Sequence, residues 1–402
     1  MSKRSTKNIV AALDIGTSKV TAMIGQIQSE GTVELIGLGT QPCRGLKKGV
    51  VVNLDLTVQA MQQAIKQAQE QANVQIESVY VALAGAHIQS LNSHGIVAIR
   101  DQEVTLADVD RVVEAAKAVV IPSDQKILHI LPQEFTVDYQ AGIRDPLGMS
   151  GVRLETEIHM ITGSVSAAQN IITCIRRCGV EIEDLVFSPL ADSEAVLTAE
   201  EKEIGVCLMD IGAGTTDVAF YNQGVIRQSI VLPVAGDQLT QDISVALRIP
   251  TPQAEEIKLT YGCALARLLH NNQTFVVPGA GDRPSKQVAD VTLAHVIESR
   301  MEEILVLIKQ QLPEDARHVL GAGIVLTGGT AQLPGLVELA EEIFGVTVRI
   351  GLPGQTADPA HATGVGLLQY GLEQQKERQD GFVKNLPGFW GRMRNWFWGQ
   401  AV

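Results

Sequence analysis

The sequence has 402 residues, of which 45% are hydrophobic and 19% charged, with a formal net charge of −13. This length allows about two to four domains with a sizeable core. The negative charge argues against nucleic acid as the main partner, because proteins that bind the phosphate backbone normally carry a basic face.

The cysteines and the hydropathy predict an intracellular protein. Five scattered cysteines, of which only Cys174 and Cys178 lie close in sequence, predict small buried side chains in a reducing compartment rather than disulfides or a zinc site. No apolar run approaches the roughly 18 residues of a membrane-spanning helix. We therefore expect a cytosolic chain, unless its C-terminal end holds it to a membrane.

The first motif follows the apolar residues 9–13. Asp14 comes at the end of this predicted strand, and Gly16, Thr17, Ser18 and Lys19 lead into a second apolar run. Glycine lets the backbone N–H groups approach an anion, and the hydroxyls add hydrogen-bond donors. A carboxylate at the strand end suits Mg²⁺ held through water. This stretch predicts a hairpin that binds phosphate.

The pattern then predicts an α/β lobe interrupted by a second module. Residues 33–38 and 79–83 are predicted strands, and residues 56–71 have the apolar spacing of an amphipathic helix. Residues 88–99, 127–139 and 152–161 are predicted strands, and residues 105–118 are a predicted helix with a capping signature. This inserted α+β module has no catalytic pattern, since His87, His94, His129 and His159 lack metal-ligand spacing. We expect it to be a contact surface.

The second motif repeats the plan of the first. A helix over residues 165–178 and a strand, turn and helix over 186–197 lead to a predicted strand that ends at Asp210. Gly212, Gly214, Thr215 and Thr216 follow Asp210 and lead into another apolar run. Two copies of one device predict two similarly built lobes that face each other.

A third motif is a strand that breaks at Gly328, Gly329 and Thr330 and leads into a helix. Backbone without side chains suits contact with a flat ring. The three motifs together resemble the phosphate-1, phosphate-2 and adenosine motifs of the actin-like ATPase superfamily.

The rest of the second lobe is predicted to be mainly helical. Helices are expected over residues 239–247, from 251 and over 293–311, with a Gly/Pro-rich connector at 273–286, and the last packed helix spans 359–372. A polar linker over residues 373–385 precedes a C-terminal amphipathic helix over 386–402. Its apolar and basic side chains have the composition of an interfacial membrane anchor, with a docking helix as the alternative; they are Phe389, Trp390, Arg392, Met393, Arg394, Trp396 and Phe397.

Taken together, these features resemble the FtsA family of bacterial actin-like cell division proteins over the whole chain. The resemblance implies an α/β, actin-like two-lobed ATPase fold with an inserted α+β subdomain. In this arrangement residues 1–85, 163–195 and 357–372 form the core of the first lobe, and 86–162 the insertion. Residues 196–235 and 312–356 form the core of the second lobe, and 236–311 its small subdomain.

The same resemblance implies partners and site residues. It implies binding of ATP and Mg²⁺, self-polymerisation, and attachment through anionic lipid to the cytoplasmic face of the inner membrane at the division site. It also implies that the protein anchors filaments of FtsZ through the FtsZ C-terminal peptide and recruits later division proteins such as FtsN. Arg300 is a predicted partner of that acidic peptide.

The implied nucleotide site comes from both lobes. Asp14 and Asp210 would order the hydrated Mg²⁺; Gly328, Gly329 and Thr330 would lie by the adenine, and Glu255 and Lys258 resemble ribose and adenine contacts. A plain i,i+3 surface pair is the alternative for Glu255 and Lys258. The phosphates would be held by Gly16, Thr17, Ser18, Lys19, Gly212, Gly214, Thr215 and Thr216.

One residue departs from the wider superfamily. Ser188 precedes Pro189 where the bacterial actins and chaperones carry a Glu that helps to orient the attacking water. We therefore expect ATP binding with slow or absent hydrolysis.

Two other functions of this fold remain open. A soluble phosphotransferase such as a sugar kinase would need a general-base Asp, for which Asp192 and Asp217 are the candidates. A chaperone-type ATPase would need a further peptide-binding domain, for which the chain leaves no room.

Overall fold

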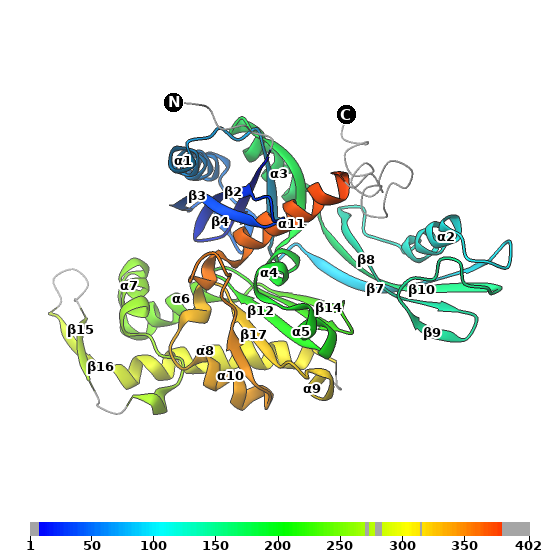
Figure 1. Ribbon diagram of the computed structural model, residues 1–402. Coiled ribbons are helices and arrows are strands. Elements are labelled where there is room, and N and C mark those ends of the chain that lie inside the picture. The colour runs from blue at the N-terminus through cyan, green and yellow to red at the C-terminus, as the bar shows by residue number, and fades with distance from the viewer. Residues whose placement is uncertain (1–7, 270–272, 278–283, 314–315, 380–402) are drawn as a thin grey trace.

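The computed structural model describes residues 8–269, 273–277, 284–313 and 316–379 (Figure 1). Two five-stranded sheets form the cores of two lobes, and a four-stranded sheet forms the inserted domain. The chain begins in the first lobe, crosses to the second and returns in its last helix. The predicted actin-like two-lobed α/β fold with an inserted subdomain is confirmed.

The first lobe has the strand order β11-β6-β1-β2-β3. These are β11 (Glu181–Phe187), β6 (Ser78–Leu83), β1 (Ile9–Ile15), β2 (Lys19–Ile27) and β3 (Val33–Pro42). On β1, Leu13 packs in the cluster that includes α1 (Leu54–Ala72) and α3 (Val165–Arg177), whereas Ala12 packs in the cluster of α11 (Ala362–Gln379). Because both faces are covered, the central strands β1, β2 and β6 are mostly apolar and buried.

The second lobe repeats this plan with the order β14-β13-β12-β17-β18. The strands are β14 (Val225–Leu232), β13 (Thr216–Asn222), β12 (Val206–Ile211), β17 (Ile324–Thr327) and β18 (Val348–Ile350). One face packs on helices that form the rest of this lobe's core. These helices are α6 (Gly236–Leu247), α7 (Thr251–Tyr261), α8 (Asp290–Gln311) and α10 (Leu336–Phe344), with the short α9 at Ala316–Val319.

The inserted domain is a sheet in the order β7-β10-β8-β9 with one helix, α2 (Leu106–Lys117). The strands are β7 (Gln89–Ala98), β10 (Arg153–Ser164), β8 (Gln125–Val137) and β9 (Gln140–Ile143). Thr105 caps α2 in the predicted capping box, which it forms with Asp108. The short β9 is the one strand of this domain that the sequence pattern did not predict.

Two segments connect the lobes. After β11 the chain crosses through α4 (Ser188–Val196) and α5 (Ala199–Ile204) to β12, and it returns after β18 through residues 351–361 to α11. The two crossings lie together, because Gly366 of α11 packs on the backbone of Ala191 in α4. The second crossing is also held to the second lobe, since Thr327 of β17 donates from Oγ1 to the carbonyl of Pro359 (3.1 Å). The smallest ladder, β4 (Leu46–Lys47) with β5 (Val50–Val51), lies in the first lobe.

Two sequence predictions differ from the structure. The connector at 273–286 contains β15 (Thr274–Val277), which pairs with β16 (Lys286–Ala289), because the alternating Phe275 and Val277 are buried and Phe275 stacks on Tyr261 with a centroid distance of 4.5 Å. The linker was predicted to start at residue 373, but α11 continues to Gln379. This part of the linker prediction is wrong, because Glu, Gln, Lys and Arg are good helix formers.

The cysteines are buried side chains, as the sequence predicted, except for the partly exposed Cys178. All five cysteines are free, and four of them are buried. Within the described ranges, no helix is both long and apolar enough to cross a membrane. The predicted amphipathic helix over 386–402, with its residues from Phe389 to Phe397, lies outside the described residues.

Candidate functional site

The two predicted phosphate loops have the same backbone geometry. In the first lobe Ile15 pairs with Val20, and in the second Ile211 pairs with Thr216, so each turn contains four residues. Gly16 N donates to Lys19 O at 3.0 Å, and Gly212 N donates to Thr215 O at 3.0 Å. The internal repeat that the sequence predicted is therefore present in the fold.

The two loops meet tip to tip. A Cβ on Gly214 would overlap Oγ1 of Thr17, so only glycine allows this approach. The same Thr17 oxygen accepts a hydrogen bond from Gly49 N (3.0 Å), and Lys48 also lies against Gly214. The loop at residues 44–49 therefore joins the site, although its sequence gave no motif that would have predicted this.

The third motif packs on the second loop. Thr330 donates from Oγ1 to the carbonyl of Gly212 (2.8 Å), and a Cβ on Gly328 would overlap Oδ1 of Asp210. Gly328 also has a φ of +86°, which other residues rarely adopt. Around Gly329, by contrast, a Cβ would meet only Ala360 at 3.8 Å, which leaves room beside the backbone.

Carboxylates from both lobes gather at these loops. Burial raises the pKa of Asp14 to about 6 and that of Asp217 to about 7. Burial, followed by the charges of Asp217 and Asp14, raises the pKa of Asp210 to about 8, although Lys19 opposes the rise. Burial and the charge of Asp210 also raise the pKa of Asp192 well above its usual range.

These carboxylates are only partly compensated. Lys19 favours the charged forms of Asp14 and Asp210, and the hydroxyls of Thr363 and Thr215 lower the pKa of Asp192 and Asp217. Both oxygens of Asp192 and Oδ1 of Asp217 are buried without a hydrogen bond of good geometry to any described residue. A buried carboxylate is costly to ionise unless a cation or donor compensates it. In the described ranges, no group of three or more His, Cys, Asp or Glu side chains is placed to ligate a metal directly. The donor set fits a cation that keeps its own water shell, as Mg²⁺ does, and the glycine-lined turns fit the phosphates.

Glu255 and Lys258 are more than a surface pair. Lys258 is 8% exposed, and its Nζ contacts Glu255 Oε2 at 2.7 Å, Thr240 Oγ1 at 2.9 Å and the carbonyl of Gly236 at 3.1 Å. Gly236 N in turn donates to Gly212 O at 3.1 Å. The structure thus places this pair next to the second loop.

Arg300 lies away from the loops, on α8. Its Nε donates to Asp242 Oδ2 at 2.6 Å, it also pairs with Glu303, and the hydrogen bond to Asp242 raises its pKa. An acidic partner would have to compete with these carboxylates. Ser188, the departure noted in the sequence, is buried at the start of α4.

Two histidines of the inserted domain, His129 and His159, make contacts with the lobes. His129 accepts a hydrogen bond from Phe187 N (3.0 Å), and burial lowers its pKa to about 4. His159 is buried against Ser229 of the second lobe, and its pKa is also lowered to about 4 by burial. Both side chains thus contribute to contacts of the inserted domain with the two lobes.

Solved structures share this architecture at low sequence identity. The PilM-PilN type IV pilus biogenesis complex has a TM-score of 0.62 and 19% identity and covers 90% of this chain and 98% of that one. MreB5 of Spiroplasma citri bound to ADP has a TM-score of 0.60 and 16% identity, with 94% and 100% coverage. Fold and site together define an actin-like protein with an inserted domain.

Relatives found by sequence comparison identify the family as well as the fold. Cell division protein FtsA of Pseudomonas aeruginosa is 52% identical over 96% of this chain and 94% of its own length, and FtsA of Escherichia coli K12 is 41% identical over 98% and 99%. The chain belongs to the FtsA family of cell division proteins. The family model "Cell division protein FtsA" matches residues 207–366, and "SHS2 domain inserted in FTSA" matches residues 85–162.

Proposed function

We propose that this protein binds ATP with Mg²⁺ between its two hairpin loops and uses the nucleotide mainly as a conformational switch. The observation that carries the proposal is the meeting of two equivalent four-residue turns through Thr17 and Gly214, beside carboxylates of both lobes whose pKa is raised by partial burial. An anion between the turns would be bound by backbone N–H groups of both lobes. Such a ligand bridges the lobes and therefore favours their closed arrangement.

Each residue has a role in this proposal. The turns Gly16–Lys19 and Gly212–Thr215, with Thr216 at the start of β13, hold the phosphates, and Asp14 and Asp210 hold the cation through its water. Gly328, Gly329 and Thr330 line the nucleoside side, together with Glu255 and Lys258. Mg²⁺ supplies positive charge among the carboxylates and shields the phosphates.

Hydrolysis is proposed to be slow or absent. Ser188 occupies the position from which a carboxylate would orient water, and a serine cannot accept a proton as effectively at neutral pH. Bound nucleotide would then persist and fix the conformation of the lobes.

Family membership supports a wider role in division. The proposal is that the protein polymerises on the cytoplasmic face of the inner membrane, held there by residues 386–402 on anionic lipid. There it anchors FtsZ filaments through the FtsZ C-terminal peptide at the Arg300 region and recruits later division proteins such as FtsN. The aromatic and basic composition of the tail supports the lipid contact.

The alternative function, a phosphotransferase, is less well supported by the site. Its general base would have to reach a substrate hydroxyl, but Asp192 is fully buried and Asp217 is 2% exposed. Asp217 also accepts a hydrogen bond from Thr215 within its own loop (2.8 Å).

The test is nucleotide binding by the full chain, measured by calorimetry with ATP and Mg²⁺ and with ATP and a chelator. We expect binding that Mg²⁺ strengthens, followed by few or no turnovers. Lack of binding would refute the nucleotide site, and steady turnover of many ATP per minute would refute the switch without hydrolysis.

A further inference from the structure

The inserted domain leaves the first lobe but contacts the second. Strand β14 is an edge of the second-lobe sheet, since its only ladder partner there is β13. Ser90 of β7 donates from Oγ to the carbonyl of Ser229 (2.9 Å), and Asn92 donates from Nδ2 to that of Arg227 (3.1 Å). Side chains of the inserted domain thus satisfy an edge that would otherwise expose its backbone.

A bulge in β14 widens this contact. The ladder between β13 and β14 skips Arg227, and the resulting bulge lies at the carbonyls of Ile226 and Arg227. Both accept from Nε2 of Gln133 on β8, at 2.9 Å and 3.2 Å. Gln133 is 5% exposed, so its amide is committed to this contact.

His159 connects the two domains through a buried relay. Its Nδ1 lies 2.6 Å from Asn92 Oδ1, and its Nε2 lies 2.9 Å from Ser229 Oγ. Because Asn92 Oδ1 can only accept, Nδ1 carries the proton and Nε2 accepts from the Ser229 hydroxyl. Every polar side-chain atom of the relay is thereby paired, and the bonds to Ser229 and to the carbonyl of Arg227 cross the boundary.

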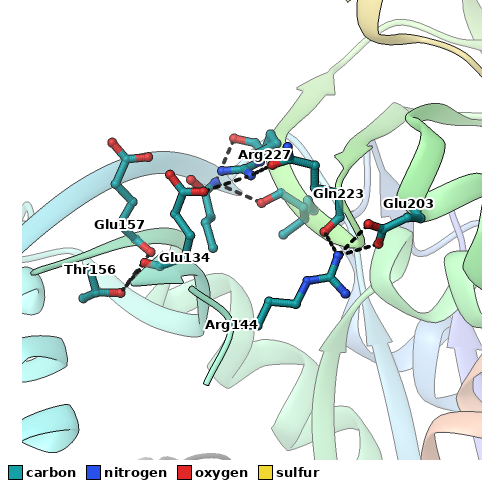
Figure 2. A network of polar contacts seen from close by, with 9 residues as sticks. Glu134, Arg144, Thr156, Glu157, Glu203, Gln223 and Arg227 are labelled. Atoms are coloured by element: carbon teal, nitrogen blue, oxygen red, sulfur yellow. Dashed lines mark hydrogen bonds and ion pairs between the residues drawn. The ribbon is translucent and has the colours of Figure 1, made fainter. Parts of the chain in front are cut away.

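Ion pairs lie at the rim of the same contact (Figure 2). Arg144 of the inserted domain bonds Glu203 of the second lobe through Nη2 at 2.5 and 2.7 Å and also reaches the carbonyl of Gln223 at 3.0 Å. Arg227 of β14 pairs with Glu134 of β8 at 3.5 Å. Both ion pairs cross the boundary, and each domain supplies one arginine and one glutamate.

The position of this contact matters for motion between the lobes. The two covalent crossings lie together at α4 and at the segment before α11, which leaves the lobes a natural axis of rotation. The contact at β14 is a third connection, on the side where the inserted domain extends from the body (Figure 1). A contact between the lobes that lies away from the axis of rotation resists rotation of one lobe relative to the other.

We propose that the inserted domain is a strap between the lobes. Its residues Gln133, Asn92 and His159 bind strand β14 of the second lobe and so hold the two lobes in the closed arrangement in which Thr17 meets Gly214. Its link to ligand rests on the proposed nucleotide function. If closed lobes bind nucleotide better, the strap and the nucleotide stabilise each other, and by linkage the coupling is equal in both directions.

The first experiment needs no nucleotide and measures amide hydrogen exchange in the full chain. Gln133→Leu removes both hydrogen bonds to β14 at similar volume. Its matched control is Thr156→Val, which removes a buried hydrogen bond of 3.0 Å to Glu134 O inside the inserted domain (Figure 2). We expect exchange of amides in β14 to rise about fivefold or more in Gln133→Leu and to stay unchanged in Thr156→Val.

Equal exchange of β14 in the two variants would overturn the strap. If Gln133→Leu does not fold, Ser229→Ala replaces it, since that change removes the donor to His159 and leaves the backbone carbonyl for Ser90. A rise in β14 with Ser229→Ala supports the strap, and no rise overturns it.

The second experiment tests the coupling by calorimetry with ATP and Mg²⁺. We expect Gln133→Leu to weaken binding about fivefold, whereas Thr156→Val binds as the wild type does. Unchanged affinity in Gln133→Leu would overturn the coupling. If the wild type binds no ATP, the proposed nucleotide function and the coupling fail, while the exchange result still decides whether the strap exists.

Discussion

Asp210 and Asp217 lie directly opposite each other across the β12–β13 hairpin, as a cross-strand pair in its ladder. Two carboxylates in this relation destabilise a sheet when both are ionised. Burial and this proximity raise the pKa of Asp210 to about 8, and burial raises that of Asp217 to about 7. The hairpin thus keeps an unfavourable pair at the point where the two lobes meet, which is typical of a site built for a cation.

Asp210→Asn should raise the stability of the protein but weaken its binding of ATP with Mg²⁺. Both groups have a folded pKa above the unfolded value near 4, so their ionisation costs stability as the pH rises toward 8. At pH 8 we expect the variant to melt at a higher temperature than the wild type, but to bind ATP with Mg²⁺ about tenfold more weakly. Thermal unfolding with and without ligand measures both effects. The exposed Asp55→Asn should change neither, and a variant that loses stability without ligand would contradict the cation-site interpretation.

His159→Gln should alter the dependence of stability on pH. The folded pKa of about 4 lies below the ordinary value of 6.5, so between these values the unfolded chain binds the proton and stability decreases as the pH is lowered from 6.5 to 4. This loss amounts to roughly 3 kcal/mol at pH 4 relative to pH 7 and disappears in the variant. Urea unfolding of both proteins across that range measures the difference. The exposed His295→Gln is the control, and parallel curves for His159→Gln and the wild type would contradict the assignment.

Gly214→Ala should block the approach of the two loops. The new methyl group would overlap Thr17 Oγ1, so the closed cleft must open slightly. We expect ATP affinity to fall about tenfold, with a much smaller change in stability. Gly354→Ala is the matched control, because no atom lies within 4 Å of its Cβ position. Titration calorimetry decides, and equal affinities would show that the loops do not close on the ligand.

Substitutions of Arg300 and Asp242 should change the affinity for an acidic peptide in opposite directions. Asp242 holds the guanidinium of Arg300 at 2.6 Å and competes with any acidic peptide. Arg300→Ala should weaken binding of an FtsZ C-terminal peptide about tenfold, whereas Asp242→Asn should strengthen it a few-fold. Fluorescence anisotropy with a labelled peptide measures both. If the two variants change affinity in the same direction, Arg300 is a structural residue of α8.

The C-terminal tail is tested with vesicles. We expect the full chain to sediment with anionic vesicles and a chain that ends at Asp380 to remain in the supernatant, because its aromatic and basic residues are then missing. Neutral vesicles provide the control for the electrostatic part. Two proteins that both remain soluble would identify the tail as a docking helix.

The fold was predictable where the sequence contains a local pattern. The two Asp-Ile-Gly hairpins, the Gly-Gly break and the alternating strands of the insertion were all recognised, because glycine placement and period-2 burial are local properties. The extension of α11 to Gln379 was missed, since polar helix formers have no apolar stripe to mark them.

The candidate site was only partly predictable for a related reason. Lys48 and Gly49 join the loops through tertiary contact, and the stacking of Phe275 of β15 on Tyr261 is likewise a tertiary contact. The contacts of Gln133 with β14 join residues more than ninety positions apart through backbone carbonyls, which every residue has. No motif could have identified them.

The close packing of Gly366 on Ala191 has a mechanical consequence. A Cβ at Gly366 would overlap the backbone of Ala191, so α11 and α4 have almost no clearance between them. Any pull on the chain beyond Gln379 enters the protein through α11 and is passed directly to the helix where the chain crosses from one lobe to the other. Tension at the C-terminus is therefore a load on the hinge itself, and not on a remote surface of the first lobe.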